Sequence, residues 1–304
     1  MPLCFKLLCF ILSENIPKWV KVSVNQLEVP IWVLHQNLVR YTFVEKLIFE
    51  KMERYSRNRV YVREEQQSRI KFFKIIIAGA GIGGVIAECL LRFGFETLTI
   101  VDDEVVEESD LNHQNYTHND IGSPKVNALK RRLMEINPDA NISIIDGAID
   151  KDNVEGLVKG RDIAINALKY DSDIPFVFDE WCQKYNIPVL HPYNIGWAGL
   201  VFVVTPTGIQ LKDICDDDHR GFEVKMIKHI FNYYKFWGEP KPWIEQVVAS
   251  YENEKCILPP PELAVASWLI AGTATHLCYK IAVGEKYLRY PRFYLDTIEE
   301  DQLI

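Results

Sequence analysis

Gly79, Gly81 and Gly84 have the spacing of a phosphate-binding loop between an apolar run, residues 72–78, and a segment of helical character. Glycines at these places allow a tight turn, let a phosphate approach backbone N–H groups, and let a helix pack closely on a strand. The N-terminus of the following helix favours a bound anion. Asp102 follows Gly79 by 23 residues and ends the next apolar run. A carboxylate at this place can accept hydrogen bonds from the hydroxyl groups of a ribose. The pattern predicts a nucleotide site and, alone, does not choose between NAD and ATP.

The elements around this loop alternate between strands and helices. Strands are expected at 72–78, 96–101, 142–145, 163–167 and 188–190, and helices at 60–70, 85–93, 125–136 and 176–185. Such alternation predicts an α/β fold with a Rossmann-like, mostly parallel sheet flanked by helices. Beyond residue 199 the pattern changes. We expect a C-terminal sheet extension and a crossover loop there, with a strand at 200–205, helices at 222–237 and 262–283, and a last strand at 292–296.

The domain organisation is read from a change in character near Met52. Residues 1–51 carry no chemical motif and no sustained hydrophobic period. Our hypothesis is that Met52 is the natural start and that 1–51 is an N-terminal extension outside the native protein; a small packed element is the alternative. Residues 52–304 are then one domain, with its nucleotide-binding core at about 72–200 and the crossover loop, helix and strand at about 201–304.

Composition argues against several classes of partner. The net charge of −8 provides no global attraction to nucleic acid or to an anionic membrane. No apolar run reaches the roughly 18 residues of a membrane-spanning helix. The seven cysteines are odd in number and form no CxxC pair, so neither a disulfide framework nor zinc is expected. A reducing cytoplasm is the expected location.

The block 101–138 is more specific than the glycine loop. It reads V-D-D-E-V at 101–105, S-D-L-N-H-Q at 109–114, D-I-G-S-P-K at 120–125 and I-N-P at 136–138. It resembles the ThiF/MoeB/HesA superfamily, bacterial relatives of ubiquitin-activating enzymes. The pattern of that superfamily is D-x-D/E-x-V-x-x-S-N-L-x-R-Q, then D-I-G-x-x-K, then I-N-P. Dehydrogenases lack this string, and the resemblance extends over about residues 54–296.

The resemblance implies an activity and the residues that carry it. Members use ATP to adenylate a C-terminal carboxylate, often that of a ubiquitin-like sulfur carrier or a peptide. Because two anions must meet, their site needs cationic groups and Mg²⁺ to neutralise charge. By position, Asp102 would hold the ribose, Lys125 would contact the phosphates, and Glu104 and Gln114 fall on the acid and the glutamine of the pattern. Arg57 matches an arginine that enters the partner subunit's ATP site, which implies a homodimer.

The sequence departs from the pattern inside this block. Asp110 replaces an asparagine, and His113 replaces the arginine that contacts phosphate. Histidine is mostly neutral at pH 7 and lacks the bidentate guanidinium. Losing one charge-assisted contact lowers the rate about ten- to a hundredfold.

A second departure concerns the metal. Where the superfamily has D-x-T-D-N, whose last acid binds Mg²⁺ or ATP, this chain has N-A-L-K-Y-D at 166–171. Counting without gaps places Tyr170 or Lys169 at the position of the acid, depending on the direction of counting. A one-residue insertion places Asp171 there, and Asp171 is the predicted metal ligand, with Asp173 as the second choice.

Cys256 is the candidate nucleophile. It lies shortly before Pro259, near the place where many members carry a cysteine in the crossover loop. A thiolate there would form a thioester, an acyl disulfide or a persulfide. It would need a lowered pKa, for which the sequence offers only Lys255.

Three functions stay open at this point. The chain is expected to be an adenylyltransferase, and pyrophosphate release would separate that activity from a non-catalytic, dimeric nucleotide-binding scaffold (a pseudoenzyme) of the same superfamily. An NAD-dependent oxidoreductase is the third function, which the glycine loop permits and the block 101–138 opposes.

Overall fold

The computed structural model describes residues 21–24, 27–30, 53–214, 221–254 and 259–299. The chain divides into two units, Met1–Arg59 and Val60–Ile304. In the first unit, β1 (Lys21–Val24) and β2 (Leu27–Pro30) form an antiparallel pair, and η1 is a 3-10 helix at Glu53–Asn58. The expected boundary at residue 52 stays a prediction.

The second unit is built on one seven-stranded sheet, with the strand order β5-β4-β3-β6-β7-β8-β9. The strands are β3 (Lys74–Ala78), β4 (Thr97–Asp102), β5 (Asn141–Asp146), β6 (Ile163–Asn166), β7 (Val189–Ile195), β8 (Ala198–Val204) and β9 (Phe293–Thr297). The strands from β5 to β7 pair in parallel, and β7-β8-β9 pair antiparallel. A mostly parallel sheet with a C-terminal extension is therefore confirmed.

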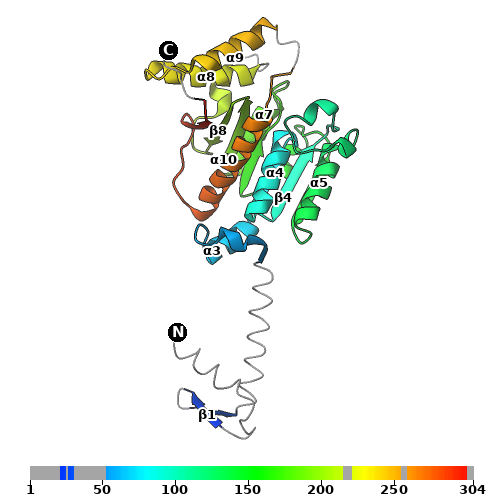
Figure 1. The fold of residues 1–304 in the computed structure, drawn as a ribbon, viewed down its shortest axis with the longest axis vertical. Helices are drawn as coiled ribbons and strands as arrows, with labels where there is room; N and C mark the ends of the chain where they lie inside the picture. The colour runs from blue at the N-terminus through cyan, green and yellow to red at the C-terminus, as the bar shows by residue number, and fades with distance from the viewer. Residues whose placement is uncertain (1–20, 25–26, 31–52, 215–220, 255–258, 300–304) are drawn as a thin grey trace. The chain divides into compact units, whose positions relative to one another are not determined.

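Helices cover both faces of this sheet (Figure 1). They are α3 (Glu64–Lys71), α4 (Ile82–Phe93), α5 (Lys125–Ile136), α6 (Val154–Val158), α7 (Ile174–Lys184), α8 (Phe222–Phe236), α9 (Pro242–Asn253) and α10 (Ala264–Val283). Alternate residues of β3 explain the layers, because successive side chains of a strand point to opposite faces. Ile75 and Ile77 pack with α3, α4, α5 and α10, whereas Ile76 and Ala78 pack with α6 and α7.

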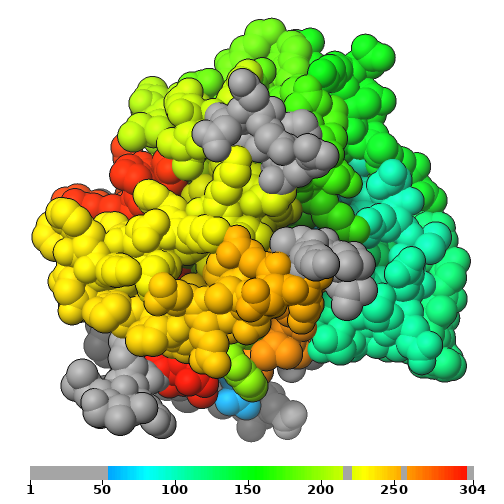
Figure 2. All heavy atoms as spheres, turned by 90° about the horizontal axis from the view of Figure 1, so that it is seen from above, coloured from blue at the N-terminus to red at the C-terminus, as the bar shows by residue number. Residues whose placement is uncertain are grey.

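Among its described residues, the region between β8 and α10 contains α9 in addition to α8, where the sequence predicted a single helix at 222–237. Helix α9 was not expected there, and it packs against α8. Pro242 lies in its first turn, where proline is tolerated, and Ile244 and Val248 bury one helical face at an i, i+4 spacing. Figure 2 shows α8 and α9, in yellow to orange, spread over one face of the molecule. Within the described ranges, no helix has the length and apolarity that crossing a membrane requires.

Strand order determines where a ligand would bind. From β3 the chain moves outward to β4 and β5, and then returns to place β6 on the other side of β3. Ligands of open α/β sheets bind at the carboxyl ends of the strands where the order reverses in this way. The segments that follow β3, β4 and β6 meet at this point. All the candidate nucleotide residues except Arg57 lie on these segments, at the end of β4, or at the starts of α4 and α5.

Candidate functional site

The glycine loop lies between β3 and α4 and is shaped by a close backbone approach. Gly79 has a positive φ of 93°, and a Cβ at this position would lie 2.4 Å from the carbonyl oxygen of Ala167. Its N–H donates to the carbonyl of Val101 at 2.9 Å. Only glycine combines this backbone conformation with this contact without strain. The turn aims the N-terminus of α4 at the carboxyl edge of the sheet.

The other glycines of the loop are limited by side chains. A Cβ on Gly81 would contact Gln114 at 3.4 Å, and one on Gly84 would lie 3.1 Å from Asn115 Oδ1. The glycine that lets α4 approach β3 closely is Gly83, because a Cβ there would lie 2.7 Å from Ile77 Cγ2. Gly83 was missed from the sequence, where the packing role was given to Gly84.

Asp102 joins the glycine loop to the segment after β4. Its Oδ2 accepts a hydrogen bond from the N–H of Ala80 at 2.6 Å, and its Oδ1 accepts one from the N–H of Glu104 at 2.7 Å. Burial raises the pKa of this carboxyl above its ordinary value, while the two N–H groups and Lys125 oppose the rise. Asp102 therefore lies beside the loop, as its spacing predicts.

Lys125 is the buried cation of the site. It begins α5, its side chain is 4% exposed, and its Nζ lies 2.9 Å from Glu104 Oε2 and 3.2 Å from Asp110 Oδ1. Burial opposes the charged form, but Glu104 and Asp110 outweigh it and raise the pKa of Lys125. A charged ammonium group beside the glycine loop suits an anionic ligand.

Asp110 has a structural role that the sequence did not show. This carboxylate is buried, and its Oδ2 accepts from the N–H of Glu107 at 2.8 Å in the 3-10 turn η2 (Glu108–Asp110). Its Oδ1 also accepts from Gln114 Nε2 at 2.7 Å. The negative charge of Asp110 is thus compensated by Lys125 and by two further donors.

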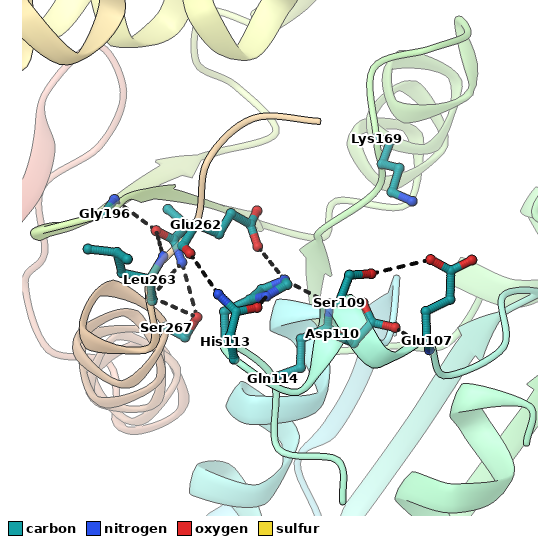
Figure 3. Close-up of polar contacts among 12 residues, drawn as sticks. Glu107, Ser109, Asp110, His113, Gln114, Lys169, Gly196, Glu262, Leu263 and Ser267 are labelled. Carbon is teal, nitrogen blue, oxygen red and sulfur yellow. Dashed lines mark hydrogen bonds and ion pairs between the residues drawn. The ribbon is translucent and has the colours of Figure 1, made fainter. Parts of the chain in front are cut away.

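His113 and Gln114 lie together at the end of this loop. Gln114 Nε2 lies 3.0 Å from His113 Nε2, and the same His113 atom lies 2.8 Å from Glu262 Oε2. Figure 3 shows Glu262, just before α10, pointing toward His113. Gln114 Oε1 is buried and finds no hydrogen-bond partner among the described residues. Gln114 Oε1 thus lacks the hydrogen bond that most buried polar atoms make.

The start of α10 is fixed to the sheet near this pair. Asn194 of β7 donates from Nδ2 to the carbonyl of Leu263 and to Ser267 Oγ, both at 3.0 Å. Asn112 Nδ2 also donates to the carbonyl of Glu262 at 3.3 Å. Sequence reasoning missed Glu262 and Asn194. The only signal for Glu262 was an acid after the prolines, and the only signal for Asn194 was a polar residue inside an apolar strand.

The segment after β6 holds four candidates; Asp173 pairs with Lys151 at 2.6 Å, and the other three lie in different settings. Lys169 is exposed, and its Nζ pairs with Glu104 Oε1. Tyr170 is buried at 5% exposure, and Asp171 is exposed. Lys169 and Lys125 outweigh the effect of burial on Glu104 and lower its pKa. Of the three, Lys169 is the residue whose side chain reaches a candidate site residue.

Tyr170 belongs to a buried cluster of polar side chains from β6, β7 and α7. Its hydroxyl lies 3.3 Å from His191 Nδ1 and 3.2 Å from the hydroxyl of Tyr193. His191 Nε2 lies 3.2 Å from Asp179 Oδ2, although neither atom makes a well-oriented hydrogen bond within the described part of the chain. Asp179 Oδ1 accepts from Asn166 Nδ2 at 2.8 Å. This cluster holds α7 against β6 and β7.

Two predicted residues, Arg57 and Cys256, belong to other parts of the chain. Arg57 is in η1, in the unit Met1–Arg59. Cys256 lies outside the described residues. The roles of both stay predictions.

Comparison with known proteins identifies the chain. Residues 55–299 match the ThiF family. The chain belongs to the ThiF family. This confirms the resemblance first found in the block 101–138, since the match covers most of the 304 residues.

Curated relatives have related names. The chain is 29% identical over 164 residues to the SAMP-activating enzyme E1 of Haloferax volcanii, covering 52% of this chain and 60% of that protein. It is 31% identical over 159 residues to the sulfur carrier protein ThiS adenylyltransferase of Bacillus subtilis, covering 50% and 47%. The heterocyst protein HesA of Trichormus variabilis is 33% identical over 184 residues, with 57% and 68% covered. The chain spans about half the length of the curated relatives it matches.

Solved structures share the fold. Escherichia coli MccB, determined with AMPCPP and MccA, superposes with a TM-score of 0.58 at 16% identity, covering 82% of this chain and 72% of MccB. PaaA superposes with a TM-score of 0.58 at 20% identity, covering 98% and 88%. At these identities the likeness shows the α/β fold.

Proposed function

We propose that this chain is an ATP-dependent adenylyltransferase that activates the C-terminal carboxylate of a small ubiquitin-like sulfur-carrier protein or peptide. The observation that carries the proposal is Lys125, a buried and charged ammonium group beside the glycine loop. Membership of the ThiF family supports the proposal. The names of two relatives also support it, because one is called an activating enzyme and the other an adenylyltransferase.

The proposed reaction uses the chain to bring two anions together. A carboxylate oxygen of the substrate forms a bond to the α-phosphorus of ATP. The bond from that phosphorus to the bridging oxygen breaks, and pyrophosphate leaves with the electron pair. The N-terminus of α4 and Lys125 would neutralise phosphate charge, and the loop beside Asp102 would seat the ribose.

We also propose that Mg²⁺ binds together with the nucleotide. The acids around the loop are engaged, since Glu104 pairs with two lysines and Asp110 with Lys125. Among the described residues there is no group of three or more metal-binding side chains. Mg²⁺ commonly binds through substrate phosphates and one or two carboxylates, and we infer that the exposed Asp171 would be the ligand from the chain. The bound metal would withdraw charge from the triphosphate.

The remaining parts of the proposal concern assembly and location. We infer a homodimer in which Arg57 enters the partner subunit's site, and a nucleophilic role for Cys256 after adenylation. The proposed partners include neither nucleic acid nor a membrane, and the proposed location is the cytoplasm. Sedimentation of the full chain tests the dimer, and a monomer at micromolar concentration would contradict it.

Thermal unfolding of the full chain with Mg-ATP, AMP or NAD tests the choice of nucleotide. A ligand at a hundred times its Kd stabilises by about 2.7 kcal/mol, and a domain of this size gains about 2–4 °C for each kcal/mol. We expect a rise of about 5–11 °C with Mg-ATP and none with NAD. A rise with NAD alone would contradict the proposal and favour an oxidoreductase.

A further inference from the structure

We propose that Lys169 is a second phosphate-binding residue, which neutralises the phosphates of ATP beyond the one seated on the glycine loop. This inference rests on the proposed function, because it assigns a further residue to the same nucleotide. Lys169 is not a member of the glycine loop or of the block 101–138. Its assignment comes from the position of the segment after β6 and from the partner of its ammonium group.

The segment after β6 lies directly against the glycine loop. Ala78, the last residue of β3, pairs with Asn166 in register, and the N–H of Ala167 donates to the carbonyl of Ala78 at 2.8 Å. The carbonyl of Ala167 is the atom that a Cβ on Gly79 would meet at 2.4 Å. Lys169 is two residues further along the chain. Its backbone is therefore positioned by the loop that would seat the first phosphate.

The ammonium group of Lys169 turns toward the site. It pairs with Oε1 of Glu104, while Lys125 pairs with Oε2 of the same carboxylate at 2.9 Å. Two cations thus share one anion next to the loop (Figure 3 shows Lys169 extending from its segment). Lys125 is the inner cation at 4% side-chain exposure, and Lys169 is the outer one at 69%. A triphosphate that extends outward from the loop would meet them in this order.

Exchange of Glu104 for phosphate as the partner of Lys169 is physically easy. Exposed ion pairs stabilise a protein little, and a long lysine side chain reorients freely. A polyphosphate carries more charge than one carboxylate and offers more acceptor oxygens. Lys169 would also remain beside the leaving pyrophosphate, where negative charge accumulates as the bond to the α-phosphorus breaks.

Calorimetric titration of the full chain tests this role with ATP and with AMP, each in EDTA and in Mg²⁺. We expect Lys169→Ala to weaken ATP binding in EDTA about fivefold, the upper end for one exposed ion pair, and to weaken AMP binding less than threefold. Mg²⁺ should reduce the loss, since it neutralises the same phosphates. Lys169→Arg should retain ATP affinity within about threefold, because it keeps the positive charge.

Lys212→Ala is the matched control. Lys212 is 62% exposed and also pairs with one glutamate, Glu180 on α7, so this variant removes a comparable surface ion pair. We expect its ATP affinity to equal that of the wild type. The inference is overturned if Lys169→Ala retains ATP affinity within threefold, or if it loses ATP and AMP equally. Absence of ATP binding by the wild type would instead overturn the proposed function itself.

Discussion

Replacing Lys125 with methionine should damage both stability and turnover, and the two effects can be separated. The variant keeps the length of the side chain but removes its charge. Asp110 is 8% exposed, so it would remain as a buried carboxylate without its cation. Removing one partner of a buried ion pair costs about 3–5 kcal/mol. Asp110 keeps hydrogen bonds from Gln114 and from the N–H of Glu107, and we therefore expect about 3 kcal/mol.

The assay is thermal unfolding, followed by pyrophosphate release. A loss of about 3 kcal/mol should lower Tm by about 6–12 °C for a domain of this size. The double variant Lys125→Met/Asp110→Asn removes both charges, and we expect it to recover at least half of the lost Tm, because the stranded charge is gone. Neither variant should release pyrophosphate. An unchanged Tm in the single variant, or no recovery in the double variant, would refute the buried pair as the cause.

Three further predictions follow from the same structure. Gly79→Ala should lower the free energy of unfolding by about 1–3 kcal/mol through backbone strain. Gly156→Ala in α6 is its control, because an added Cβ there has nothing within 4 Å, and this variant should not lower Tm. The Glu88 carboxylate is desolvated, yet Arg132, Asn115 and Arg92 hold its pKa below 4.5. Its stabilising effect is present above pH 4.5 and is lost as pH falls through the lowered pKa, so the Tm gap between wild type and Glu88→Gln should close in acid; a constant gap contradicts this. His113→Arg should raise the rate of pyrophosphate release about tenfold or more, and an unchanged rate would remove His113 from phosphate binding.

The sequence predicted the elements of the site better than their contacts. The helix 125–136 was predicted with its observed ends, because Pro124 precedes it and Asn137-Pro138 follows it. The strand before Gly79 was equally clear, since a β-branched run buried on both faces has few alternatives. Both predictions rest on the local pattern of residue types in the sequence.

The contacts that were missed depend on strand order and not on local pattern. Lys169 and Glu104 are 65 residues apart, and they meet because β6 returns to the side of β3 opposite β4. His113 and Glu262 meet because Asn194 of β7 fixes the start of α10. The burial of Lys125 likewise alters a simple expectation: a lysine that begins a helix looks dispensable for folding, but its ion pairs with two carboxylates make it structural.

The central claim is tested most directly by the products formed from ATP. The full chain would be incubated with ATP, Mg²⁺ and a sulfur-carrier protein ending in a free carboxylate, and the same carrier with an amidated C-terminus would be the control. We predict pyrophosphate and an adenylated carrier with the free carboxylate, and no pyrophosphate with the amide. Formation of ADP and phosphate, or no consumption of ATP by a chain that binds it, would contradict adenylation.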